Sequence, residues 1–166
     1  MQTNSVTAEI QIRTGLRPGD AGYIIYMHGT LYSKEYSYGT GFEIYVAEGL
    51  VAFVKNYNAE KERIWICESD GRFAGCLVLA DREQAAQLRY FLIDPVFRNR
   101  GLGKKLLHLF IAFAKEAGYS SSFLWTTSEL PAAAKLYQQL GYKLTEEKAS
   151  SFFGKVVTEQ RYELHF

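Results

Sequence analysis

The chain has 166 residues, a length typical of one globular domain, and its 48% hydrophobic and 22% charged residues exclude a disordered, collagen-like or tandem-repeat protein. Its 19 Lys and Arg residues and 18 Asp and Glu residues give a formal net charge of +1, so no global field attracts nucleic acid or an anionic membrane. The uncommon number is the 15% of aromatic residues, with 12 Tyr and 11 Phe, which predicts dense packing, a lined cleft, or both.

The hydrophobic periodicity changes several times along the chain between that of strands and that of helices. Strands are predicted at residues 8–13, 63–68, 72–80, 84–93, 123–127, 142–147 and 152–164. Helices are predicted at residues 20–32, 42–57, 101–117 and 131–140. This order predicts one mixed α/β domain over residues 1–166. Ligands of such sheets bind beyond the carboxyl ends of strands, and this points to the junction after Ile93.

Nothing in the sequence predicts a membrane span, a disulfide or a metal site. The longest apolar stretch, residues 106–114, is far shorter than the ~20 residues that a membrane-spanning helix needs. The first residues lack the basic start and apolar run of a signal peptide, so we expect a cytoplasmic protein. A hairpin turn at Asp70-Gly71 would place Cys67 and Cys76 on one face of a sheet, about 7 to 8 Å apart, as buried free thiols rather than a disulfide.

A run of cations follows Ile93. Residues 98–105, with the sequence RNRGLGKK, contain four cations and no carboxylate, and an apolar helix is predicted to start within them. Cations are the wrong charge for a helix N-terminus, so the run destabilises the helix unless an anion binds there. Gly101 and Gly103 remove side chains where an oxyanion would approach the unpaired N–H groups of the first turn. This arrangement favours a phosphate or diphosphate ligand, with a solvated basic face as the alternative.

The spacing of this run excludes two common phosphate loops. It has neither the G-x-x-x-x-G-K-S/T of a P-loop nor the G-x-G-x-x-G of a dinucleotide fingerprint. It matches R-x-x-G-x-G/A at Arg98, Gly101 and Gly103, and residues 133–142, AAKLYQQLGY, are close to A-x-x-L-Y-x-x-x-G-F/Y. With these two motifs and its order of elements, the chain resembles the GCN5-related N-acetyltransferase (GNAT) family over nearly its whole length.

The resemblance implies a fold and a co-substrate. The fold is a central, mostly antiparallel, twisted sheet of about seven strands flanked by about four helices. The first motif would hold the pyrophosphate of acetyl-CoA, and the end of the fourth strand would bind the pantetheine arm through its backbone. The residues that the resemblance assigns to acetyl-CoA are Phe91, Leu92, Ile93, Arg98, Asn99, Arg100, Gly101, Leu102, Gly103 and Lys104.

The implied reaction moves an acetyl group from a thioester to a primary amine. An amine with a pKa near 10.4 must lose its proton, which costs about 4.6 kcal/mol at pH 7, so a base is expected. Some relatives carry a glutamate at the position of Gln87, but an amide takes no proton. Glu43 or Glu83 is therefore the candidate base. Tyr137 matches the family's tyrosine acid, which would donate to the leaving thiolate.

Tyrosines crowd the first two predicted helices, which wall the acceptor site in this family. We therefore expect Tyr23, Tyr26, Tyr32 and Tyr45 to line that site, with core packing as the alternative for each ring. The predicted function is acetyl-CoA-dependent N-acetylation of a small-molecule or peptide amine by a monomer or homodimer, without a metal, nucleic acid or membrane. Two other functions stay open: a non-catalytic acyl-CoA sensor or interaction module, and a binder of nucleotide phosphates.

Overall fold

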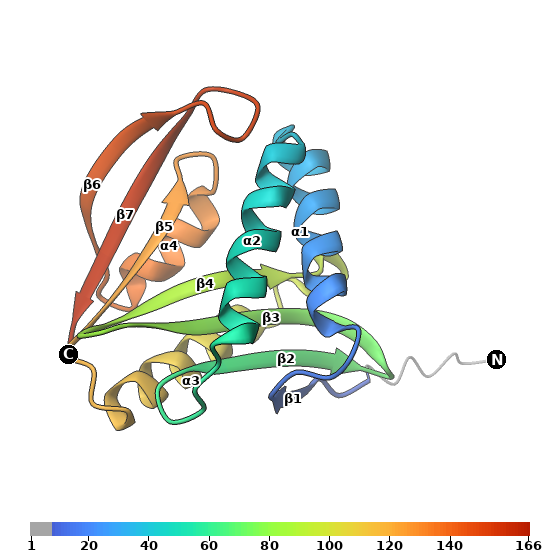
Figure 1. Ribbon diagram of the computed structural model, residues 1–166, viewed down its shortest axis with the longest axis vertical. Coiled ribbons are helices and arrows are strands. Elements are labelled where there is room, and N and C mark those ends of the chain that lie inside the picture. Colours follow the sequence, from blue (N-terminus) through green and yellow to red (C-terminus); the bar gives the residue numbers. More distant parts are fainter. Residues whose placement is uncertain (1–7) are drawn as a thin grey trace.

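The computed structural model describes residues 8–166 as a seven-stranded sheet covered by helices (Figure 1). The strands are β1 (Gln11–Thr14), β2 (Arg63–Ser69), β3 (Arg72–Arg82), β4 (Ala85–Ile93), β5 (Ser121–Thr127), β6 (Lys143–Ser150) and β7 (Val157–His165). The helices are α1 (Asp20–Tyr36), α2 (Thr40–Lys55), α3 (Leu102–Glu116) and α4 (Pro131–Gln139), with the 3₁₀ helix η1 (Pro95–Phe97). The strand order is β1-β2-β3-β4-β5-β7-β6. Only β4 and β5 pair in parallel among these strands, which confirms the predicted fold class.

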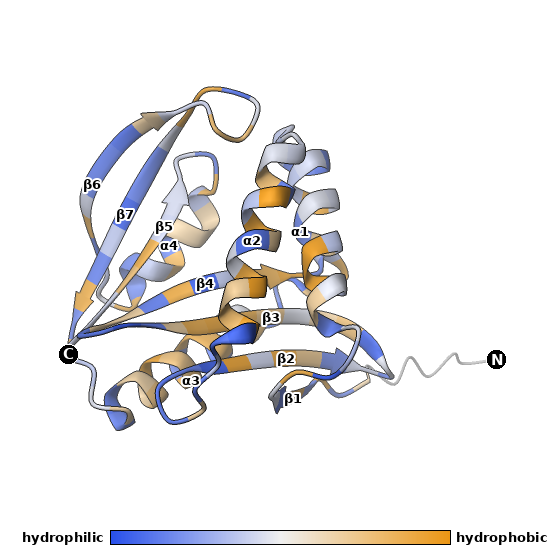
Figure 2. Ribbon diagram, in the orientation of Figure 1, coloured by the Kyte–Doolittle hydropathy of each residue, from blue (hydrophilic) through white to orange (hydrophobic). Residues whose placement is uncertain are grey.

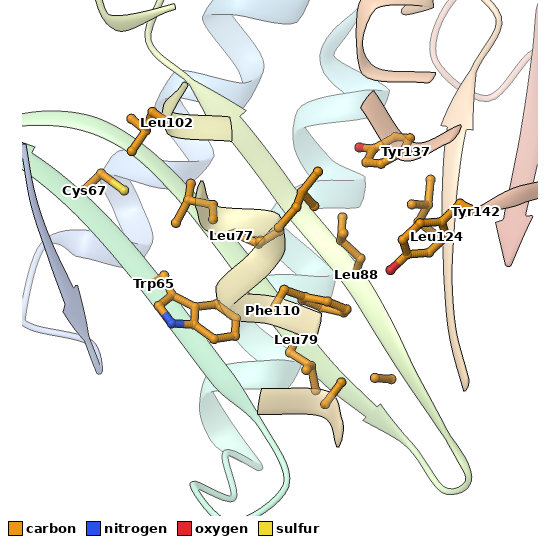
Figure 3. Packing of buried hydrophobic residues seen from close by; sticks show 14 of the residues in the cluster. Trp65, Cys67, Leu77, Leu79, Leu88, Leu102, Phe110, Leu124, Tyr137 and Tyr142 are labelled. Carbon is orange, nitrogen blue, oxygen red and sulfur yellow. The ribbon is translucent and has the colours of Figure 1, made fainter. Parts of the chain in front are cut away.

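Two hydrophobic cores, one on each face of the sheet, hold the layers together. Helices α1 and α2 cover one face over β2, β3 and β4, and α3 lies on the other (Figure 1). Leu77 and Phe110 belong to the core beneath α3 (Figure 3), whereas Val78 belongs to the core beneath α1 and α2. Because β3 supplies both cores, it is apolar on both sides. By contrast, β6 and β7 are mostly hydrophilic (Figure 2).

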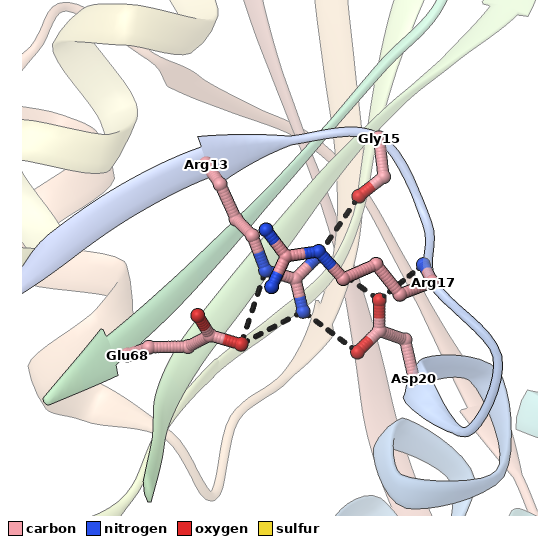
Figure 4. A network of polar contacts seen from close by, with 5 residues as sticks. All are labelled: Arg13, Gly15, Arg17, Asp20 and Glu68. Atoms are coloured by element: carbon pink, nitrogen blue, oxygen red, sulfur yellow. Dashed lines mark hydrogen bonds and ion pairs between the residues drawn. The ribbon is translucent and has the colours of Figure 1, made fainter. Parts of the chain in front are cut away.

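An ion-pair network fixes the start of α1 against the edge of the sheet (Figure 4). The guanidinium of Arg13 on β1 lies 2.8 Å from a carboxylate oxygen of Asp20 and 2.8 Å from one of Glu68 on β2. The Asp20 carboxylate also accepts a hydrogen bond from the backbone N–H of Arg17, at 2.6 Å. These contacts join β1, β2 and the first residue of α1.

The last hairpin differs from the sequence prediction. Residues 152–156 form a loop and β7 begins at Val157, so the predicted strand 152–164 is wrong at its start. The Phe153 carbonyl accepts a hydrogen bond from the N–H of Gly39, in the turn between α1 and α2, at 2.9 Å. Gly154 has a φ of 85°, which favours glycine. This loop is therefore fixed by a contact with a distant part of the chain, which local periodicity does not reveal.

The two cysteines lie on opposite faces of the sheet, contrary to the prediction that they share one. The turn at Asp70-Gly71 is present, with φ values of 49° and 72°. However, a β-bulge between Cys67 and Glu68 shifts the register, so that Cys76 pairs with Ile66 rather than with Trp65. Neighbouring residues of a strand point to opposite faces, and Cys67 and Cys76 accordingly belong to different cores. Both thiols are free and buried.

His28 is a buried imidazole on α1. Its ring stacks on Tyr32 and meets Tyr90 edge-on, each with ring centroids 5.9 Å apart. Its Nδ1 lies 2.8 Å from the carbonyl oxygen of Ile24, and because that oxygen only accepts, Nδ1 carries the proton. Burial lowers the pKa of His28 to about 4, so the ring is neutral at physiological pH.

This neutrality predicts an acid sensitivity of the fold. The unfolded chain binds a proton at His28 near pH 6.5, whereas the folded chain does so only near pH 4. Unfolding is therefore favoured as the pH falls through this window, and the free energy of unfolding should be about 2 kcal/mol lower at pH 5 than at pH 7.5 from this group. Urea denaturation at both pH values measures it. His28→Gln should lose this part of the pH dependence, and His165→Gln, which removes an imidazole with 79% side-chain exposure, should keep it.

Candidate functional site

A cleft of about 510 Å³ lies where β4 and β5 separate. These strands pair over only Ala85–Leu88 and Ser121–Leu124, and beyond Leu88 they diverge. The ends of β4 and β5 line the cleft, together with α1, α2, the start of α3, α4, the β6–β7 loop and β7. Among the residues that the structure describes, the last part of β4 has no strand partner on its β5 side. The backbone N–H and C=O groups that point to this side are therefore without a strand partner and can bind a ligand, although the Ile93 carbonyl also accepts a hydrogen bond from the Arg98 Nε.

A second bulge shapes this free edge of β4. Val78 of β3 pairs with Arg89 and Cys76 pairs with Leu92, so β4 contains one residue more than its partner over this segment. Tyr90 takes up the extra length with a φ of 51°. Its carbonyl accepts a hydrogen bond from the Cys76 thiol at 3.1 Å. The predicted cofactor residues Phe91, Leu92 and Ile93 follow this bulge, and all three line the cleft.

The first turn of α3 faces the cleft without a cap from any side chain. Gly101 precedes it with a φ of 76°, and no acidic residue lies in the turn. A Cβ atom at Gly103 would lie 3.2 Å from the ring of Phe91, so this glycine allows α3 to pack closely against β4. Unpaired N–H groups at a helix N-terminus form an anion site, and the Lys104 ammonium adds positive charge there.

The residues of the cationic loop do not all line the cleft. Those that line it as expected are Asn99, Gly101, Leu102, Gly103 and Lys104. Arg98 also lines it, but its guanidinium forms an ion pair with Glu35 of α1 at 2.9 Å and its Nε donates to the carbonyl of Ile93 at 3.1 Å. Arg100 is not among the lining residues and stands over the Phe97 ring, 5.5 Å from its centroid. Arg98 thus joins the loop to α1.

Tyr137 of α4 lies in the wall of the cleft, next to the free end of β4. Its ring is 5% exposed, and its centroid lies 6.3 Å from that of Phe91 and 6.0 Å from that of Tyr142. Figure 3 shows Tyr137 and Tyr142 in the core beside Leu124. Burial raises the pKa of Tyr137 far above its ordinary value, and the neighbouring Tyr32 and Tyr142 phenols add to the rise. The hydroxyl therefore stays protonated and can donate a hydrogen bond into the cleft.

Neither candidate base lies in the cleft. Glu43 is an exposed residue of α2 whose carboxyl group lies against Gly29 of α1. Glu83 occupies the exposed turn between β3 and β4, with a φ of 61°, and this turn is at the opposite end of β4 from the cationic loop. The carboxylates that line the cleft are those of Glu35, which pairs with Arg98, and Glu159 of β7.

The tyrosines of the first two helices divide between the cleft and the outer surface. Tyr32 and Tyr45 line the cleft, but Tyr23 and Tyr26 do not. Tyr23 packs on Phe73 with ring centroids 5.2 Å apart, and Tyr26 is 58% exposed. The sequence-based prediction thus places two rings at the site that the structure places elsewhere on α1.

Other residues that line the cleft come from distant parts of the sequence. The Tyr38 hydroxyl and the Thr127 Oγ1 are hydrogen bonded at 2.8 Å, so the turn after α1 is joined to the end of β5. The ring of Phe153 stacks on that of Tyr38, at 5.4 Å between centroids. Arg89 and Trp125 also line the cleft, just beyond the last pair of β4 and β5. The one local signal for Arg89 was that it is the only charged residue of β4.

Two negative findings concern the described residues 8–166. Within them, no three or more His, Cys, Asp or Glu side chains are grouped so that they could hold a metal ion. Over the same residues, no helix combines the length and apolar character that crossing a membrane requires.

The chain matches the sequence model of the acetyltransferase (GNAT) family over residues 29–142. It is 33% identical to human N-acetyltransferase 8 over 106 residues, which are 60% of this chain and 45% of that protein. It is 34% identical to N-acetylaspartate synthetase of Danio rerio over 85 residues, which are 50% of this chain and 30% of that protein. The chain thus spans less than half the length of these curated relatives.

A similar fold occurs in yncA of Salmonella typhimurium, whose structure was solved with its cofactor acetyl-CoA. The two folds superpose with a TM-score of 0.72 at 19% sequence identity, over 94% of this chain and 93% of that one. The family match covers more than half of the present chain and includes both the cationic loop and Tyr137. On these grounds the chain belongs to the GNAT acetyltransferase family.

Proposed function

We propose that this protein is an acetyl-CoA-dependent N-acetyltransferase that acts on a primary amine of a small molecule or peptide. The observation that carries the proposal is the continuity between the free edge of β4 and the uncapped first turn of α3. Both border one cleft. CoA has amide groups at one end and a diphosphate at the other, so its amides suit the free edge of β4 and its diphosphate suits the first turn of α3.

The residues of the cleft fit such a ligand from end to end. The free N–H groups at the start of α3 and the Lys104 ammonium suit the diphosphate. The backbone of Phe91, Leu92 and Ile93 suits the amides of the pantetheine arm, because it offers the hydrogen-bonding groups of a sheet edge. Acetyl-CoA supplies the activated acetyl group as a thioester.

Tyr137 would hold a proton for the departing sulfur. Its hydroxyl is protonated at any physiological pH because burial raises its pKa. The leaving thiol has a pKa near 8.5, so its thiolate is a weaker base than a phenolate. A hydrogen bond from the Tyr137 phenol, without full transfer of the proton, is therefore sufficient to stabilise the developing thiolate. The Tyr137 ring is held by Phe91 on β4, which places the donor beside the strand that would bind the pantetheine arm.

The acceptor amine must lose a proton, and Glu159 replaces Glu43 and Glu83 as the candidate base. It lines the cleft from β7, opposite Thr127. Among the residues described here, it forms no ion pair within 4.0 Å. A carboxylate in this position can hold the ammonium form of the acceptor and accept its proton directly or through water.

The non-catalytic alternative keeps the cleft but lacks turnover. Release of CoA from acetyl-CoA, measured with amino acids, polyamines, aminoglycosides and lysine peptides, separates the two functions. Acetylation of one acceptor class above background supports the enzyme. Tight acetyl-CoA binding without any acetylated product supports the sensor.

Tyr137→Phe should lower kcat by about 10²-fold, the usual contribution of a positioned acid, and should leave the Kd for acetyl-CoA unchanged. Steady-state kinetics with the best acceptor and calorimetry with acetyl-CoA measure the two quantities. The control is Tyr142→Phe, because this ring lies in the same core and its hydroxyl bonds Ser122 at 2.8 Å. The control should lose about 1 kcal/mol of stability and keep its kcat. A normal kcat in Tyr137→Phe would remove this residue from the mechanism.

Lys104→Glu should raise the Kd for CoA by about tenfold, because it places a carboxylate beside the diphosphate site at the start of α3. The control is Lys105→Glu, the same charge reversal one residue later. The positive charge of Lys105 partly offsets the rise that burial causes in the pKa of the Cys67 thiol. Lys105 does not line the cleft. Calorimetry should therefore find a much smaller change for the control. Equal effects of the two substitutions would mean that only net charge matters and that the start of α3 is not the diphosphate site.

A further inference from the structure

Arg89 is a cation in the cleft for which the proposed reaction with acetyl-CoA gives no role. It belongs to β4 and lines the cleft, yet among the described residues no carboxylate lies within 4.0 Å of its guanidinium. Arg98, in contrast, is paired with Glu35. A half-buried arginine without an anion keeps unused hydrogen-bond donors in a partly desolvated place.

The β4 bulge places this guanidinium beside two aromatic rings. Because of the extra residue at Tyr90, Tyr90 enters the core beneath α1 and α2, whereas Leu88, two residues earlier, enters the core beneath α3. The Arg89 Cζ atom lies 4.7 Å from the Tyr90 ring centroid and 5.5 Å from that of Tyr45 on α2. A guanidinium held over rings directs its N–H groups outward along their edge, where a carboxylate accepts two of them at once.

Helix α2 leaves room for this arrangement at Gly49. A Cβ atom there would lie 2.8 Å from a terminal nitrogen of Arg89 and 2.3 Å from the Tyr90 hydroxyl. Any other residue at position 49 would displace the guanidinium. The Arg89 side chain is therefore packed between α2 and β4, and this packing restricts its movement.

Arg89 and Trp125 both line the cleft, and each directly follows the last pair of β4 and β5, Leu88 and Leu124. Tyr45 of α2 stands against Arg89, whereas α3, which carries the proposed diphosphate site, lies on the other face of the sheet. Glu159 lines the same cleft from β7, opposite Thr127. Arg89 and Glu159 have opposite charges and are not paired with each other. The two groups match a molecule that has both an ammonium and a carboxylate.

We propose that the acceptor is a small amine that also carries a carboxylate, an amino acid or the end of a short peptide, and that Arg89 binds this carboxylate. The proposal rests on the N-acetyltransferase function proposed above and specifies its substrate class. It makes Arg89 a substrate-binding residue that sets KM and selectivity. A polyamine, with positive charge only, would meet repulsion from the same guanidinium.

The test compares acceptors in matched pairs, L-phenylalanine with L-phenylalaninamide and Gly-Phe with its amide. The amide of each pair has the lower amine pKa, so a preference for the carboxylate cannot come from the amine's own reactivity. We expect kcat/KM to be at least about tenfold higher for the carboxylate, mostly through KM. The pair with the higher kcat/KM distinguishes a free amino acid from a peptide end.

Variants of Arg89 should abolish this preference. Arg89→Gln should bring the ratio of kcat/KM within each pair to about one, and Arg89→Lys, which keeps the charge but not the fork, should give an intermediate ratio. The control is Arg63→Gln, because Arg63 also stacks on a ring, that of Phe113 at 4.1 Å, but does not line the cleft. It should keep the wild-type ratio. Circular dichroism and thermal unfolding check that each variant is folded.

Binding gives a second readout that needs no turnover. Calorimetry of the complex with CoA should detect L-phenylalanine and not its amide, and Arg89→Gln should lose this binding. If amides or spermidine are acetylated as well as the carboxylates, the proposal on Arg89 fails while the N-acetyltransferase function stands. If no amine is acetylated but the carboxylate still binds through Arg89, the proposed catalysis fails and the carboxylate site stands. Equal binding of acid and amide overturns the proposal in either case.

Discussion

The site depends on one constraint, the separation of β4 from β5 after the Leu88 and Leu124 pair. A sheet interior normally satisfies every backbone N–H and C=O group, and here a stretch of central strand is left without a neighbouring strand. The bulge at Tyr90 turns this edge and directs the side chain of Arg89 toward α2. The cleft, the proposed pantetheine contacts and the proposed carboxylate site all result from this local failure of two strands to pair.

Long-range contacts hold the separated strands in place. The Tyr38 hydroxyl joins the turn after α1 to Thr127 at the end of β5. Lys155 of the β6–β7 loop donates to the carbonyl of Tyr36 and contacts the Glu129 carboxylate, after β5, at 2.5 Å. Because these partners come from distant parts of the sequence, this part of the cleft depends on the assembled fold, whereas the proposed diphosphate site needs only one loop and the helix that follows it.

This difference explains how far the sequence could predict the structure. The order of elements could be predicted because hydrophobic periodicity is a local property of each segment. The cationic loop could be predicted because its charges and glycines lie close together in the sequence, at Arg98 to Lys104. The faces of Cys67 and Cys76 were not, since a bulge shifts the register without a sequence signal of its own. The charged lining residues Arg89 and Glu159 were missed for a related reason, because only the pairing of strands β4, β5 and β7 brings them to one cleft.

The thiol beneath the bulge has a consequence for the route of the acetyl group. The Cys76 Sγ donates to the carbonyl of Tyr90, and burial raises the pKa of this thiol well above its ordinary value, so it is held as a hydrogen-bond donor and not as a thiolate. A ping-pong reaction through a protein cysteine would need a thiolate. The Cys76 sulfur is thus unsuited to carry an acetyl group, which agrees with direct transfer to the acceptor amine in the proposed reaction.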